Sequence, residues 1–236
     1  MSLYEKMLKL DWMNAAFIYS GLRCSTSQKH DVPGTSTIFS VGKPVECHLQ
    51  EYFSGDWVED LNPFLNSPDN TFALVTALNL NRKANALIIE ALCNSGAKVI
   101  SEELNIKTLC KILQKDVQGE YYAVVCFQQW EFIKELAKDS ANIEEGEPWL
   151  GINWKLSSDL PMKDDKRRCF IYKTGAIGFA DSGKFKVDIT WHGERASHFV
   201  NTSLLMGAVA LHPEQIYEID CKEVVNEIRT DTISNL

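Results

Sequence analysis

The sequence predicts an α+β fold, and three observations lead to this class. Residues 67–93 have the pattern of one long helix with small and apolar side chains along one stripe. Residues 185–191 alternate apolar and polar side chains, which is typical of a strand with one covered face. From residue 121 onward, short helical and extended patterns follow one another.

The composition limits the classes of function. The 236 residues are 45% hydrophobic and 24% charged, as in an ordinary globular protein. The net charge is −8, whereas a groove that binds nucleic-acid phosphates needs a basic surplus. The seven cysteines are odd in number and include no CxxC pair, which favours reduced thiols over a disulfide framework or a zinc site. No apolar run predicts a transmembrane helix, and the first residues are a poor match to a signal peptide.

The first sixty residues predict a helix and a hairpin. Residues 3–19 have a helical pattern, and residues 35–41 and 45–52 are expected to form two strands around Gly42-Lys43-Pro44. Val45, Cys47 and Leu49 give the second strand an apolar face. A lone hairpin is marginally stable, so this face is expected to pack on another surface.

Residues 67–93 are predicted to form the longest helix. Ser67 is suited to the N-cap and Pro68 to the first helical position, and Gly96 is expected to stop the helix. One stripe carries Ala73, Ala77, Leu80, Ala84, Leu87 and Ala91. About twenty-five residues give a helix of roughly 38 Å. A second helix is expected at residues 106–114.

The second half predicts alternating elements. Strands are expected at residues 122–127, 150–156, 169–172, 185–191, 208–211 and 216–219, and helices at 128–138 and 196–204, the latter broken at Gly207. Residues 141–148 read as an acidic loop, 163–168 as a charged turn and 225–236 as a polar tail. Phe185, Val187, Ile189 and Trp191 are expected to lie in the core.

Residues 191–203 contain most of the side chains that could do chemistry, namely His192, Glu194, Arg195, His198 and Ser203. A nucleophilic triad needs serine, histidine and an acid to converge. Ser203 and His198 are five residues apart, which separates them on a helix, and no glycine-rich elbow surrounds Ser203. The two histidines also lack the spacing of a helical zinc pair. A structural role for this stretch is therefore favoured.

Three other segments are candidates for chemistry. Cys126 ends a strand before a helix, where a nucleophilic thiol can lie, although a buried strand cysteine is far commoner. Residues 173–180 hold only part of a dinucleotide-binding fingerprint. Residues 166–168 are basic, but Asp164 and Asp165 offset them, which favours a solvated turn. No catalytic, cofactor-binding or metal-binding residue is expected.

The order of segments in the second half resembles a known family. The segments are YAVVCFQQW from residue 122, LGINW from 150, LP at 160, CFIYKTGAIGFA from 169, VDITW from 187, HFV from 198, MGAV from 206 and IYEI from 216. Together they resemble the C-terminal half of tailed-phage major capsid proteins with the Hong Kong 97-type fold. The match covers residues 76–221 and consists of apolar and small residues in order.

The resemblance implies a fold and a division of the chain. It implies an N-terminal arm at residues 1–34, an extended hairpin loop at 35–60 and an α+β apical domain at 105–162. The apolar face of the hairpin loop, with Val45, Cys47 and Leu49, would then pack on a neighbouring subunit. A peripheral domain with a long spine helix would combine residues 61–104 and 163–236.

The resemblance also implies a function. The chain would be a self-assembling subunit of an icosahedral-type shell of a tailed phage, a prophage or a gene-transfer particle. The shell would enclose DNA without sequence-specific binding, as part of the virion, after assembly in the host cytoplasm. Scaffold, portal or decoration proteins would be further partners, and no enzymatic activity, cofactor or membrane is implied.

Two alternatives remain open. An encapsulin-like compartment would use the same fold to enclose protein cargo. A small cytosolic enzyme would use Cys126 or His192.

Overall fold

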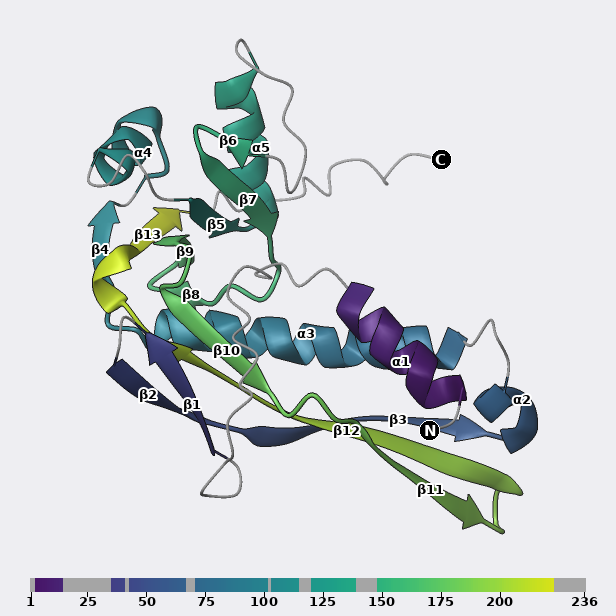
Figure 1. Ribbon diagram of the computed structural model, residues 1–236. Helices are drawn as coiled ribbons and strands as arrows, with labels where there is room; N and C mark the ends of the chain where they lie inside the picture. The colour runs from purple at the N-terminus through teal and green to yellow at the C-terminus, as the bar shows by residue number, and fades with distance from the viewer. Residues whose placement is uncertain are drawn as a thin grey trace, which may run out of the picture.

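The computed structural model describes residues 3–14, 35–40, 43–66, 71–101, 103–114, 120–138 and 148–222. These residues form two parts (Figure 1). A lower part combines a long, narrow sheet with helices α1 and α3, and an upper part is a seven-stranded sheet with helices α4 and α5. The expected α+β class is confirmed.

Helix α3 (Thr71–Cys93) is the predicted long helix. Of the expected stripe, Ala73, Ala77, Leu80, Ala84 and Ala91 are buried, so the small residues allow the helix to lie close to the sheet. Gly96 follows with a φ of 72°, a backbone conformation that favours glycine, and the chain turns away from the helix there. The predicted N-cap at Ser67 lies outside the described residues.

Helix α1 (Leu3–Asn14) crosses α3 and covers one part of the lower sheet. Its Tyr4 hydroxyl donates to Thr76 Oγ1 at 3.2 Å and lies 3.0 Å from Thr202 Oγ1. This buried contact therefore joins α1, α3 and the sheet. Residues 15–19 of the expected helix lie outside the described part. A short helix that the sequence analysis missed, α2 (Leu61–Asn66), packs Phe64 on Tyr4 with 4.5 Å between ring centroids.

The lower sheet is organised around β12 (Ser197–Ala210). Strands β11 (Lys186–His192) and β10 (Ile177–Asp181) pair with successive parts of β12, and β3 (Gln50–Val58) pairs with residues 198–206 of β12. The helix expected at residues 196–204 is therefore wrong. Gly207 does not break an element either, because it lies inside β12 opposite Ala180.

The predicted hairpin is present as β1 (Thr35–Ser40) and β2 (Lys43–His48). Lys43 and Pro44, which were expected in the turn, belong to the second strand, and residues 41 and 42 lie outside the described part.

The upper sheet has the strand order β4 (Lys98–Ser101), β13 (Ile216–Lys222), β9 (Lys166–Lys173), β5 (Tyr121–Val125), β7 (Ile152–Leu156) and β6 (Pro148–Trp149), with β8 (Met162–Lys163) on β9. The strands predicted around residues 122–127, 150–156, 169–172 and 216–219 are confirmed. Strand β4 was not predicted. The charged turn is confirmed at Asp164 and Asp165, which both have a positive φ between β8 and β9, whereas Lys166, Arg167 and Arg168 already belong to β9.

Helices α4 (Ile106–Leu113) and α5 (Phe127–Ala137) pack on this sheet, close to their predicted positions. Asn105 caps α4 by accepting a hydrogen bond from the Thr108 backbone N–H at 3.0 Å. The main core lies between these helices and the sheet and extends to α3. Its fully buried aromatic residues include Tyr121, Trp154, Phe170 and Tyr172.

Of the acidic loop expected at residues 141–148, residues 141–147 lie outside the described part and Pro148 begins β6. The polar tail expected at residues 225–236 also lies outside it. Within that part, no helix has both the length and the apolar composition needed to cross a membrane.

Candidate assembly surface

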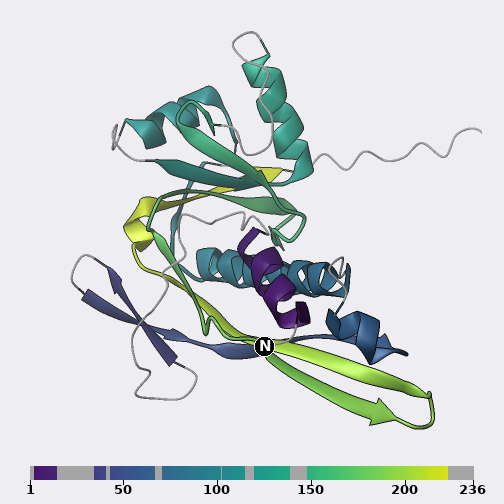
Figure 2. The same ribbon diagram turned by 45° about the vertical axis from the view of Figure 1, so that its right-hand side comes forward.

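The hairpin of β11 and β12 contains every polar residue of the stretch at residues 192–203. The two strands pair from Lys186 with Ser203 to His192 with Ser197. The turn is closed by hydrogen bonds from Arg195 N to His192 O at 3.1 Å and from Ala196 N to Gly193 O at 3.3 Å. Its tip extends beyond the helices of the lower part, as Figure 2 shows most clearly. Side chains at the tip therefore have no helix above them.

One face of the tip carries an aromatic cluster around Trp57 of β3. The Trp57 ring lies 5.0 Å from the His192 ring and 4.9 Å from the Phe199 ring, centroid to centroid. The Arg195 guanidinium lies 4.5 Å from the Trp57 ring, which is the geometry of a cation–π contact. A Cβ on Gly55 would lie 2.4 Å from Phe199 Cζ, so glycine leaves the room that this ring occupies.

The other face of the tip carries Trp191 and Ile189. Trp191 is 55% exposed and Ile189 is 39% exposed, although the sequence predicted both for the core. The strand itself is confirmed, and Phe185 and Val187 are partly buried against the core. The difference arises because the covering helices end before the tip. The Trp191 ring lies 4.7 Å from that of His198 on the neighbouring strand β12, centroid to centroid.

These positions do not form a catalytic triad. His198 and Ser203 lie on one extended strand five residues apart, which separates them by about 17 Å and places them on opposite faces. Ser203 is buried and donates to Glu51 Oε1 at 2.6 Å, while His192, Glu194 and Arg195 are exposed at the turn. The structural interpretation of this stretch is supported, with Ser203 more buried than a half-exposed polar residue.

Cys126 lies where the sequence placed it, between β5 and α5. Its side chain is buried, and its Sγ donates to Gln129 Oε1. A buried thiol that contacts a neighbouring amide is not positioned to meet a substrate. Among the described residues, no three His, Cys, Asp or Glu side chains are grouped in a way that could hold a metal ion.

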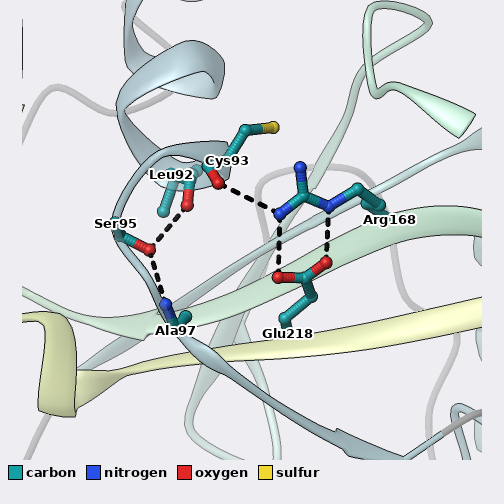
Figure 3. A network of polar contacts seen from close by, with 6 residues as sticks. All are labelled: Leu92, Cys93, Ser95, Ala97, Arg168 and Glu218. Atoms are coloured by element: carbon teal, nitrogen blue, oxygen red, sulfur yellow. Dashed lines mark hydrogen bonds and ion pairs between the residues drawn. The ribbon is translucent and has the colours of Figure 1, made fainter. Parts of the chain in front are cut away.

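The residues that sequence reasoning missed are Arg168 and Glu218, which join the two parts of the molecule (Figure 3). Arg168 of β9 donates to both carboxylate oxygens of Glu218 of β13, from Nε at 2.5 Å and from Nη2 at 2.9 Å. Nη2 also donates to the carbonyl oxygen of Cys93 at 3.1 Å. Arg168 thus donates a hydrogen bond at the C-terminal end of α3, where carbonyl oxygens have no partner within the helix. Its positive charge also interacts favourably with the negative end of the helix dipole.

The surroundings of this pair favour the charged arginine. The hydrogen bonds to Glu218 raise the pKa of Arg168, and burial opposes this increase. The Glu218 side chain is only 4% exposed and that of Arg168 is 19% exposed. The expected solvated basic turn is therefore wrong for Arg168. Arg167 is also engaged, since its Nη1 donates to the Leu160 carbonyl at 2.5 Å.

The base of the β1–β2 hairpin corrects another prediction. Cys47 and Leu49 are buried in their own chain, in a cluster with Ile38 and Ala180. Burial raises the pKa of the Cys47 thiol to about 11. The face that was expected to cover a neighbouring subunit therefore belongs to the core of this chain, at least at Cys47 and Leu49.

Gly178 and Gly207 explain how the hairpin can lie so close to the sheet. A Cβ on Gly207 would lie 2.2 Å from the backbone oxygen of His48, and one on Gly178 would lie 2.8 Å from Ile38 Cδ1. Residues 173–180, which match part of a phosphate-binding pattern, thus lead into a strand with small residues for close packing, β10.

Comparison with known proteins gives a consistent result. The family model described as phage capsid protein matches residues 130–223. No curated protein sequence matches the chain.

Three solved structures illustrate the similarity of fold. The capsid of an empty GTA particle has a TM-score of 0.65 at 10% identity, covering 88% of this chain and 90% of that one. The SrpI encapsulin complex from Synechococcus elongatus PCC 7942 has a TM-score of 0.61 at 13% identity, covering 89% and 86%. A chain of Mycobacterium phage Che8 has a TM-score of 0.54 at 15% identity, covering 75% and 73%.

At these identities the structures establish the fold alone. The expected capsid fold and the resemblance to phage capsid proteins are confirmed, and the family match supports a capsid shell protein.

Proposed function

We propose that this chain is the major capsid subunit of a tailed phage, a prophage or a gene-transfer particle, and that its copies assemble into a closed shell around DNA. The observation that carries the proposal is the match of residues 130–223 to phage capsid proteins, on a chain that has the capsid fold over most of its length.

The exposed tip of the β11–β12 hairpin supports self-assembly. Trp191 and Ile189 on one face, and Phe53 and Trp57 of the adjacent strand β3 on the other, are large apolar side chains exposed to solvent. A soluble monomer rarely leaves such residues together without a partner. Copies of the same chain would remove them from water in a symmetric assembly.

The proposal assigns roles to parts of the chain. Residues 1–34 serve as the arm and residues 35–60 as the extended loop. Residues 61–104 and 163–236 form the peripheral domain around α3, and residues 105–162 form the apical domain. The grouping of residues 61–104 with 163–236 is supported by Arg168, which connects β9 to the end of α3.

The net charge of −8 is consistent with a container for DNA. A negative inner wall repels phosphates, so DNA can be packed without adhering to it. The assigned role requires no catalysis, and His192, His198, Ser203 and Cys126 are not brought together for any. Scaffold, portal and decoration proteins are proposed as further partners, and the virion and the host cytoplasm as the locations.

A second function has one specific observation in its favour. The SrpI encapsulin has the same fold, so a compartment that encloses protein is the alternative. The family match, which is to phage capsid proteins, favours the shell around DNA.

The experiment is to purify the protein and observe it by negative-stain microscopy and light scattering across a range of salt and protein concentrations. Closed particles are expected, and nuclease-protected DNA is expected in particles made in the presence of the other capsid proteins. Particles that contain protein cargo and no nucleic acid would favour the compartment. A strictly monomeric chain under all conditions, with or without phage partner proteins, would contradict both functions.

A further inference from the structure

A hollow of about 590 Å³ lies between the middle of α3, strand β3 and the loop that follows β7. Its volume falls within the range of small-molecule sites, about 300–1,000 Å³. Residues 53–55 of β3 line one side, and Asn79, Arg82 and Lys83 of α3 line the next. Asp159, after β7, lines the third. The hollow therefore lies where the lower and upper parts of the molecule meet.

The hollow is at the open edge of β3. Successive side chains of a strand point to opposite faces, so three consecutive residues line one hollow when it lies at the edge of the strand. In the described part of the chain, β3 pairs with β12 on one side and with no strand on the other. Backbone groups on such an edge have no strand partner, so a ligand in the hollow can also reach backbone N–H groups.

The side chains around the hollow are mainly hydrogen-bond donors. Arg82 and Lys83 are both exposed, and neither side chain forms a hydrogen bond or ion pair with another described residue. Asn79 Nδ2 donates to Ser54 Oγ at 3.4 Å, which leaves the hydroxyl hydrogen of Ser54 available to a ligand. A ligand that only accepts hydrogen bonds would satisfy these groups.

The hollow is positively charged although the chain is negative. Arg82 and Lys83 give two positive charges and Asp159 gives one negative charge, so its lining has a net charge of +1, whereas the whole chain has −8. A second hollow, between the C-terminal half of α3 and the base of the β1–β2 hairpin, is lined by Glu46 and Glu90 and by no lysine or arginine. Positive charge is thus a property of the first hollow and not of every hollow along α3.

These features match a phosphate group. A phosphate has roughly one to two negative charges near neutral pH, and its terminal oxygens are strong acceptors. The planar guanidinium of Arg82 can donate two parallel hydrogen bonds to two of these oxygens, and the Lys83 ammonium adds a compact charge. Phe53, which is 55% exposed, lines the same hollow and offers an apolar surface to the group that the phosphate is attached to.

We propose that this hollow binds a phosphate group through Arg82 and Lys83, with Ser54 and Asn79 as further donors. The phosphate belongs either to a nucleic-acid backbone or to a small phosphate compound. In the first case, one site in each copy would hold DNA at spaced points, while the net charge of −8 keeps the remaining surface repulsive. The site is formed within a single chain, so it does not depend on the proposed shell.

The first measurement is the ³¹P NMR line width of inorganic phosphate in the presence of the protein near neutral pH. Phosphate that exchanges onto a slowly tumbling chain or particle gives a broader line. The parent protein is expected to broaden the line, and R82Q/K83Q is expected to lose most of this broadening. The matched control K6Q/K9Q removes the same charge from two exposed lysines of α1 and is expected to keep it.

Ser54→Ala tests the arrangement of donors without changing the charge. It removes one hydroxyl from the hollow and is expected to weaken phosphate binding about threefold, the usual effect of one hydrogen bond. Circular dichroism and thermal unfolding of each variant check that the fold is intact.

A short fluorescently labelled DNA duplex distinguishes the two sources of phosphate by its anisotropy. If a backbone phosphate is the ligand, R82Q/K83Q should bind the duplex about tenfold more weakly than K6Q/K9Q and with a smaller salt dependence, because fewer counterions are released. Inorganic phosphate should then compete with the duplex. Loss of phosphate binding in R82Q/K83Q with unchanged duplex binding would assign the site to a small phosphate compound.

Two results would overturn the phosphate site. Equal effects of R82Q/K83Q and K6Q/K9Q on the line width would mean that phosphate responds only to the overall charge. An acidic peptide that displaces phosphate at a lower concentration than phosphate itself requires would assign the hollow to carboxylates. Light scattering on the same samples records assembly separately, so failure of the site and failure of the shell are distinguishable.

Discussion

Arg168 and Glu218 form two parallel hydrogen bonds across β9 and β13, and the same guanidinium reaches the last residue of α3. The nitrogen–oxygen distances are 2.5 and 2.9 Å within the pair and 3.1 Å to the Cys93 oxygen (Figure 3). The planar guanidinium is the side chain that can make all three bonds at once. The pair therefore fixes the upper sheet on the end of the long helix.

Replacing Arg168 by Ala should destabilise the chain strongly. The substitution leaves the Glu218 carboxylate buried without its partner and opens the Cys93 carbonyl, and breaking a buried pair costs about 3–5 kcal/mol. A cost at the lower end of this range is expected because the Arg168 side chain retains some contact with water. Denaturant unfolding of the dissociated chain measures the difference.

Asp188→Ala supplies the matched control for Arg168→Ala. Lys186 and Asp188 also form an ion pair, at 3.2 Å, but both side chains are mostly exposed. Loss of such a pair should cost less than about 1 kcal/mol. Equal effects of the two substitutions would show that the pair at Arg168 is an ordinary surface contact.

Asp220 should make stability depend on pH near this network. Burial raises the pKa of its carboxyl and the adjacent Glu218 raises it further, while Arg168 and Lys163 oppose the change. The folded state thus binds the proton more tightly than the unfolded chain does, and stability is lost as pH rises from about 4 through the higher folded value.

Asp220→Asn should remove this loss of stability at higher pH, because the amide stays neutral and can still donate to Glu218. The variant should be more stable than the parent at pH 7 and should have no advantage below about pH 4. Unfolding midpoints across this range measure it. A variant less stable than the parent at pH 7 would mean that the Asp220 charge is favourable where it lies.

The Arg168–Glu218 contact also shows what could not be predicted from the sequence. Helix α3 was predictable because its signals are local, with small residues at helical spacing and Gly96 after the end. Arg168 was assigned to a solvated turn because its neighbours are charged, whereas its partner lies fifty residues away. The spacing of apolar and polar residues along the sequence does not show which distant residue will be the partner.

The error at residues 196–204 has a related cause. Ala196, Phe199, Val200 and Leu204 match a helical spacing, but Val200, Thr202, Leu204 and Met206 also alternate, and all four are buried. The segment forms a strand because it pairs with β11 on one side and with β3 on the other. Strand β3 is about 150 residues earlier, so the deciding contact was not visible locally.

Substitution by alanine should affect mainly particle assembly at Trp191 and mainly stability at Trp154. Trp191→Ala should change the free energy of unfolding by less than about 1 kcal/mol, because the ring is more exposed than buried, and should reduce particle yield. Trp154→Ala should cost about 3–5 kcal/mol, because its ring is fully buried in the core. Light scattering and denaturant unfolding separate the two effects. A Trp191→Ala variant that forms particles normally would remove this tip from the assembly surface.

Gly207 should tolerate no side chain, since the base of the β1–β2 hairpin lies directly on it. A Cβ there would lie 2.2 Å from the His48 backbone oxygen and 3.0 Å from Cys47 Sγ, so Gly207→Ala must move backbone, at a cost of about 1–3 kcal/mol. Gly193→Ala is the control, because the nearest atom to its Cβ is Trp191 Nε1 at 3.8 Å, and a change within about 0.5 kcal/mol is expected.

The Gly207→Ala substitution should also release the hairpin. Burial holds the pKa of the Cys47 thiol at about 11, so the thiol alkylates slowly near neutral pH. If the hairpin moves off β12, Cys47 becomes hydrated and its pKa falls toward the ordinary value, which increases its reactivity. Iodoacetamide labelling mapped by mass spectrometry should therefore show faster modification of Cys47 in Gly207→Ala than in Gly193→Ala. Unchanged labelling with lost stability would place the strain in β12 itself and leave the hairpin attached.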